Sequence, residues 1–113
     1  MSGGTLIIAG GALTDHAAEV FQAFVQAAGG SDRRFEVLPS GSSVPDEAFA
    51  VVQGHLAELG VPAASVHLLL ASWRVPGWEG GAEDPAVAAL VDGCDGIWIL
   101  GGDQNEIIRC LVR

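Results

Sequence analysis

The residues best suited to chemistry lie near the end of the chain, in the turn Gly101-Gly102-Asp103-Gln104. The apolar run Ile97-Trp98-Ile99-Leu100 before it predicts a fully buried strand, and the polar residues after it predict the start of a helix. Paired glycines let backbone amides approach a ligand, and a helix start adds free N–H groups with a partial positive charge. The turn is therefore predicted to cradle an oxyanion or a carboxylate.

Two polar side chains of this turn are candidates for binding a substrate. Gln104 carries both donors and an acceptor, so it can hold a carboxylate or an amide. Asp103 is placed to cap the helix, which is its favoured role, and it also stands beside Gln104 where it can contact the same ligand. Asp103 and Glu106 could form an acid–base pair, but the preference of a helix's first turn for acidic residues explains both of them.

The remaining glycine and serine motifs are better explained by turns than by catalysis. Gly10-Gly11 has no GxGxxG context and the chain contains no lysine for a phosphate loop, so we expect a tight turn beside Gly101 and Gly102. A loop follows Pro39 and contains Ser40, Ser42 and Ser43, but no G-x-S-x-G elbow surrounds these serines. Turn and capping chemistry accounts for them.

The titratable and sulfur-containing residues show no ligand spacing. His16 and His55 fall on predicted helices and His67 on a predicted strand, so we expect no metal site. Cys94 and Cys110 do not form a CxxC pair and are predicted to be free thiols in a reducing compartment.

The hydrophobic periodicity indicates which helices and strands position this turn. It predicts an α/β fold with a mostly parallel sheet and helices on both of its faces. The predicted strands are Thr5–Ala9, Arg34–Leu38, Ser65–Leu70 and Gly96–Leu100. The predicted helices are Thr14–Ala28, a segment from Ser43 to Leu59, Asp84–Val91 and a last helix from Asp103 onward.

Several residues set the ends and faces of these helices. Gly29-Gly30 and Gly60 are the expected stops of the first two helices. Ser43, with Asp46 or Glu47, is expected to cap the second helix, and Pro85 after Asp84 starts the third. The second helix has an inward stripe of Phe49, Val52, Leu56 and Leu59.

The least regular stretch runs from Ala71 to Ala82 and contains Trp73 and Trp78. Such a loop after a strand is placed to line a substrate cleft. Tryptophans are also large apolar anchors that simply pack a loop down. The sequence leaves these two alternatives open.

No cap, glycine or proline closes the last predicted helix before Arg113, and four βα units leave a sheet edge for a fifth strand. We therefore expect residues 1–113 to be the amino-terminal half of a single α/β domain. That half needs a second polypeptide segment.

The composition of the chain limits which kinds of partner it is expected to bind. The 113 residues include 14 acidic side chains and no lysine, and the net charge of -9 repels nucleic acid and anionic membranes. There is no apolar run of 18 residues and no basic, apolar leader at the start of the chain. We predict a cytoplasmic protein.

The order of four motifs resembles the amino-terminal half of the cyanophycinase-like serine peptidases, the S51 group that includes aspartyl dipeptidase. The motifs are Gly10-Gly11-Ala12-Leu13, Phe24-Val25 with Ala28-Gly29-Gly30, Val37-Leu38-Pro39-Ser40-Gly41-Ser42, and Asp95-Gly96-Ile97-Trp98-Ile99-Leu100-Gly101-Gly102-Asp103-Gln104. The match extends along the whole chain, and its Gly-Gly-Asp-Gln element is the most specific part.

This resemblance implies a class I glutamine-amidotransferase-like fold, related in shape to flavodoxin, and a serine hydrolase that uses no cofactor. Gly102, with Gly101, matches the loop that forms the oxyanion hole, and Gln104 matches the glutamine that contacts an aspartyl or β-aspartyl peptide. The family's nucleophilic elbow follows this loop, so serine, histidine and acid are expected from a second chain or a downstream segment. A heterodimer formed by proteolytic processing, or another oligomer, is one expected form, and a non-catalytic flavodoxin-like module that binds small ligands is the alternative.

Overall fold

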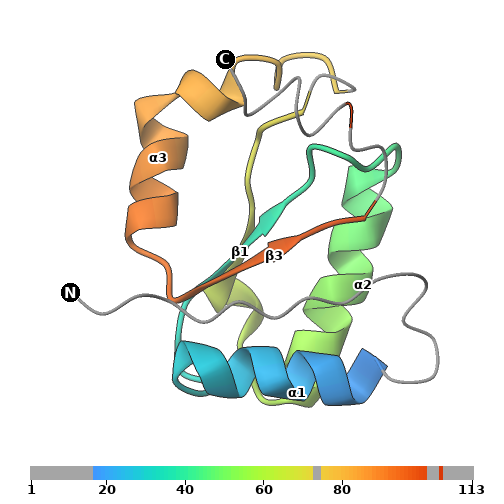
Figure 1. Ribbon diagram of the computed structural model, residues 1–113, viewed down its shortest axis with the longest axis vertical. Coiled ribbons are helices and arrows are strands. Elements are labelled where there is room, and N and C mark those ends of the chain that lie inside the picture. The colour runs from blue at the N-terminus through green and yellow to red at the C-terminus, as the bar shows by residue number, and fades with distance from the viewer. Residues whose placement is uncertain (1–16, 73–74, 102–104, 106–113) are drawn as a thin grey trace.

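The computed structural model describes residues 17–72, 75–101 and 105, and this part of the chain has an α/β fold (Figure 1). Its helices and strands alternate in the order expected of βα repeats. In chain order they are α1 (Ala17–Ala28), β1 (Phe35–Leu38), α2 (Pro45–Glu58), β2 (Val66–Leu68), α3 (Pro85–Asp92) and β3 (Gly96–Ile99), with short 3₁₀ turns at Ala63–Ser65 and Gly81–Glu83. The predicted fold class is confirmed.

The described strands form one parallel sheet in the order β2-β1-β3. In its register Glu36 of β1 stands opposite His67 of β2 on one side and Ile97 of β3 on the other. The strand predicted at Thr5–Ala9 and the turn at Gly10-Gly11 lie outside the described residues.

Helices α1 and α2 cover one face of the sheet and form the main core with it. Phe21 and Val25 of α1 and Val52 and Leu56 of α2 are buried against the sheet residues Phe35, Val37 and Val66. The predicted stripe of α2 is confirmed, because Phe49 and Leu59 also pack on this core. Apolar burial of this kind is the main stabilising term of a small domain.

An aromatic cluster fixes α1 on β3. The indole of Trp98 stacks on Phe21 with ring centroids 4.1 Å apart and meets Phe24 edge-on at 5.3 Å. Phe24 in turn contacts Phe35 of β1 at 5.4 Å. Aromatic pairs in such geometries add to the stability that burial alone provides.

Helix α3 lies on the opposite face of the sheet, apart from α1 and α2 (Figure 1). A second, smaller core forms there where Val87, Leu90 and Val91 pack on Leu38 and Leu69. Because both faces of β1 are covered, all four residues of this strand are buried.

Glycines end α1 and α2 as predicted. At Gly60, φ is +88°, and the N–H groups of Gly60 and Val61 donate to the carbonyls of Ala57 and Leu56, both at 3.0 Å. This is the Schellman arrangement, which satisfies carbonyls left free at a helix end. Gly29 and Gly30 close α1 in the same way.

The predicted start of α3 is also confirmed. The Asp84 carboxylate accepts a hydrogen bond from the N–H of Ala86 at 2.9 Å, and Pro85 takes the first helical position. A proline is tolerated there because the first N–H of a helix has no partner within the helix.

The predicted cap of α2 is wrong. Val44 occupies the capping position and no side chain caps the helix, while Ser43 is exposed. The preceding serine, Ser42, is buried and its hydroxyl accepts a hydrogen bond from the Val44 N–H at 3.1 Å. A local serine turn has therefore replaced the capping box.

The prediction that the Gly96–Leu100 strand is fully buried is wrong as well. Trp98 packs on the main core and Leu100 is buried, but the alternate side chains are exposed, Ile97 at 40% and Ile99 at 58%. Neighbouring residues of a strand point to opposite faces. Helices α1 and α2 cover one of those faces fully, whereas the eight-residue α3 covers the other only in part.

Candidate functional site

The carboxyl ends of β1 and β3 meet at the edge where the predicted cradle begins. The Leu100 N–H donates to the Leu38 carbonyl at 3.0 Å, which sets Gly101 beside the end of β1. Gly101 is exposed, and a Cβ placed on it would find no atom within 4 Å. The backbone at Gly101 is therefore accessible at the sheet edge where ligands of open α/β folds bind.

Of the predicted site residues, the structure describes Gly101. Gly102, Asp103 and Gln104 lie outside the described residues. The next described residue, Asn105, is helical and exposed, in agreement with a helix that starts after the glycine turn.

The serines near this edge have structural roles. Ser40 is fully buried and its hydroxyl donates to the Ala71 carbonyl at 2.8 Å. That bond joins the segments that follow β1 and β2. Ser42 supports the turn before α2 by the bond to Val44. Turn chemistry therefore explains Ser42, whereas Ser40 makes a long-range bond between two loops and the capping role expected for Ser43 is not observed.

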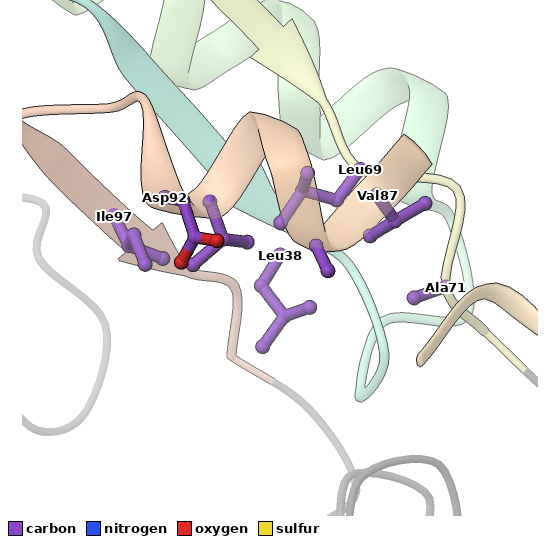
Figure 2. A pocket seen from close by; sticks show the side chains of 8 residues that line it. Leu38, Leu69, Ala71, Val87, Asp92 and Ile97 are labelled. Carbon is purple, nitrogen blue, oxygen red and sulfur yellow. The ribbon is translucent and has the colours of Figure 1, made fainter. Parts of the chain in front are cut away.

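A cavity of about 330 Å³ lies between α3 and the sheet. Figure 2 shows side chains converging on it from α3, from the end of β1 at Leu38, from the segment after β2 at Leu69 and Ala71, and from Ile97 near the start of β3. Its wall is apolar apart from the carboxylate-bearing Asp92, and comprises Leu38, Leu69, Ala71, Val87, Ala88, Val91, Asp92 and Ile97. Its volume falls within the range of small-molecule sites.

Of the two tryptophans in the loop from Ala71 to Ala82, the structure describes Trp78, and Trp73 lies outside the described residues. Trp78 is half-buried, and its carbonyl accepts hydrogen bonds from Ser72 and Gly81, each at 3.1 Å. Its side chain is not part of the wall of the cavity beneath α3. Of the two alternatives for Trp78, these contacts favour packing of the loop.

Sequence reasoning missed a buried ionisable pair on the α3 face of the sheet. The Glu36 side chain is 0% exposed, and its Oε1 lies 3.0 Å from Nδ1 of His67, whose side chain is 38% exposed. Burial raises the pKa of Glu36, while the nearby His67 and Arg34 oppose that rise. One feature of the sequence could have indicated this pair. Glu36 and His67 are each the second residue of a strand, and the two strands pair in register.

The other histidine and the thiol in the described part have packing roles. His55 stacks on Phe21 with ring centroids 4.6 Å apart. The Cys94 thiol donates to the Val91 carbonyl at 3.1 Å, and burial, with the charges of Glu36 and Asp95, raises its pKa. A raised pKa keeps a thiol protonated and weakly nucleophilic.

Two features are absent from residues 17–72, 75–101 and 105. In this part of the chain there is no cluster of three or more histidine, cysteine, aspartate or glutamate residues able to hold a metal ion. None of the helices described there has both the length and the apolar character needed to cross a membrane. Cys110 and His16 lie outside this part.

Comparison with protein-family models, with curated proteins and with solved structures finds no match to this chain.

Proposed function

We propose that this chain is the amino-terminal part of a cyanophycinase-like serine hydrolase that cleaves peptide or β-aspartyl bonds. The observation that carries the proposal is the accessible Gly101 backbone at the carboxyl edge of a parallel sheet. That is where the Gly-Gly-Asp-Gln motif must stand in order to face a substrate. The proposed enzyme is cytoplasmic.

In this proposal the glycine turn stabilises negative charge. When a serine attacks the scissile carbonyl, the carbonyl oxygen becomes an oxyanion, and the N–H of Gly102, with Gly101 beside it, donates to that oxygen. Removing one such donor typically costs about 3–4 kcal/mol of transition-state stabilisation. Gln104, with Asp103 next to it, binds the aspartyl part of the substrate.

The serine, the histidine and the acid come from a second segment in this proposal, either a downstream part of the same polypeptide or a partner subunit. We assign none of them to Ser40 or Ser42, because both hydroxyls are buried and engaged in hydrogen bonds. A fluorophosphonate probe tests the assignment in protein purified from its native source with all its companion segments. We expect one labelled serine, located by peptide mapping outside residues 1–113; absence of labelling together with absence of β-aspartyl peptide hydrolysis would contradict the proposal.

Replacement of the proposed substrate-binding glutamine tests the site directly. In the active assembly, Gln104→Ala should raise the KM for a β-aspartyl dipeptide about tenfold or more, because a hydrogen bond to a charged group is lost. The matched control is Gln22→Ala on the exposed side of α1, which should leave KM unchanged. Equal KM values for both variants would remove Gln104 from the site.

The cavity beneath α3 favours a second candidate function, a non-catalytic module that binds a small apolar ligand. Its wall offers apolar side chains and a single carboxylate, Asp92, which suits a ligand with an amine at one end. Screening of amine-bearing apolar fragments by NMR would test it. Shifts confined to Leu69 and Val87, without fluorophosphonate labelling of the native assembly, would favour this function over the hydrolase.

A further inference from the structure

Glu36 occupies an unusual place for a carboxylate, on the central strand of the described sheet and fully buried. Its Oε1 is 3.0 Å from Nδ1 of His67, but its Oε2 is buried and has no hydrogen-bond partner among the described residues. An unpaired buried oxygen is costly, and more so when the carboxylate is ionised. The net charge of the pair therefore matters for the stability of this region.

The pair exists in two relevant charge states. In its net-neutral state one proton lies between Oε1 and Nδ1, and a second proton is on Nε2 of His67. Loss of one proton from the pair leaves a net charge of minus one beside the Oε2 of Glu36. The partly exposed imidazole lets that proton reach solvent, while the carboxylate stays buried.

The charged and titratable groups around Glu36 only partly compensate this negative charge. Arg34, before β1, is the nearby cation, but it is exposed, so solvent screens it. The loop between α3 and β3 contributes Cys94 and the acidic Asp95, and α3 contributes Asp92 to the cavity wall on this face. Asp95 and Asp92 are carboxylates, and their negative charges favour the net-neutral state of the Glu36–His67 pair.

The element that the pair secures is short. β2 has three residues and is an edge strand of the described sheet, and its ladder to β1 ends with the N–H of Leu69 donating to Val37 at 2.9 Å. Beyond Leu69, the Ala71 carbonyl holds Ser40 at the carboxyl edge. This hydrogen bond links the segment after β2 to the sheet edge next to Gly101.

We propose that Glu36 and His67 form a proton-dependent latch, which holds β2 on β1 when the pair is net neutral and loosens it when the pair loses its proton. The pKa of Glu36, raised chiefly by burial, agrees in sign. A carboxyl with a folded-state pKa above its unfolded value stabilises the fold at low pH. That stabilisation falls as the pH rises from the unfolded pKa through the folded one.

Amide hydrogen exchange at β2 measures the latch directly. From about pH 5 to about pH 8, the range above the ordinary pKa of a glutamate carboxyl, we expect the opening equilibrium at His67, Leu68 and Leu69 to rise about tenfold, or about 1.4 kcal/mol, after correction for intrinsic exchange. The amides of α1 around Val25 serve as the internal reference, because α1 packs on the other face. Equal changes at β2 and α1 would overturn the proposal.

Glu36→Gln keeps a side chain of the same shape and prevents the pair from becoming net negative, so the loosening of β2 at higher pH should disappear. The matched control is Glu58→Gln on the exposed surface of α2, which should keep the dependence of the unmodified protein. If Glu36→Gln does not fold, NMR titration of the unmodified protein decides. The chemical shift of the Glu36 carboxyl carbon should change across this pH range, and a carboxyl signal that stays constant throughout would overturn the latch.

Discussion

Gly96, the first residue of β3, shows how closely the main core is packed. A Cβ built on Gly96 would lie 3.0 Å from Cζ of Phe24 and 3.1 Å from Cδ1 of Phe35. Both rings are held in the aromatic cluster that joins α1 to the sheet, so neither can move away freely. The φ of Gly96 is not positive, so the backbone conformation does not require a glycine here. The glycine is needed because the two rings leave too little space for a Cβ.

Gly96→Ala should therefore destabilise the protein by about 1–3 kcal/mol through overpacking. The control is Gly80→Ala, where a Cβ would meet no atom within 4 Å; there we expect a change within about 0.5 kcal/mol. Urea denaturation of both variants gives the comparison. Equal stabilities would show that the two rings adapt to the added methyl group.

At the scale of elements, local chemistry decides where each helix begins, although not always through the residue that the sequence suggests. Helix α3 begins with the Asp84 carboxylate on the Ala86 N–H, as predicted. Helix α2 begins at Pro45 without a side-chain cap, and Ser42 supports the turn before it. Of the two caps expected from the sequence, the structure therefore contains the one at Asp84 and not the one at Ser43.

Replacement of the two residues tests that difference. Asp84→Ala should lower the free energy of unfolding by about 1 kcal/mol, the usual effect of losing a helix cap. Ser43→Ala should change it by less than about 0.5 kcal/mol, because this side chain is exposed and makes no capping bond. Thermal unfolding followed by circular dichroism measures both, and a larger loss for Ser43→Ala would restore the capping box.

At the scale of the whole molecule, two properties stand out: a sheet covered by helices on both faces, and a strongly acidic chain. The packing brings the ends of β1, β2 and β3 to one edge, where hydrogen bonds from Ser40 to Ala71 and from Leu100 to Leu38 tie them together. The net charge of -9 acts on the entire chain, since like charges repel more strongly in the compact state than in the unfolded one.

Salt should therefore stabilise this protein. Raising NaCl from about 10 mM to about 500 mM shortens the screening length several-fold, so the midpoint of thermal unfolding at neutral pH should increase by several degrees. Differential scanning calorimetry at matched protein concentration measures it. A midpoint that falls with added salt would show that attractive ion pairs outweigh the general repulsion.

Hydrophobic periodicity and turn chemistry were sufficient to predict the α/β class, the three described strands, the stops at Gly30 and Gly60 and the cap at Asp84. These features depend on residues within a few positions of one another, so the local sequence contains the information. The exposed Gly101 at the sheet edge followed from the same reasoning. The roles proposed for Gly102, Asp103 and Gln104 stay predictions.

Only the tertiary structure decided which strands are neighbours and how completely each face is covered. Placing β1 between β2 and β3 buried Glu36 and brought it to His67, although the two residues are 31 positions apart. The partial cover by α3 left Ile97 and Ile99 exposed in a strand whose composition predicted full burial. Burial and ionic pairing depend on segments distant in the chain, and for that reason local patterns do not contain them.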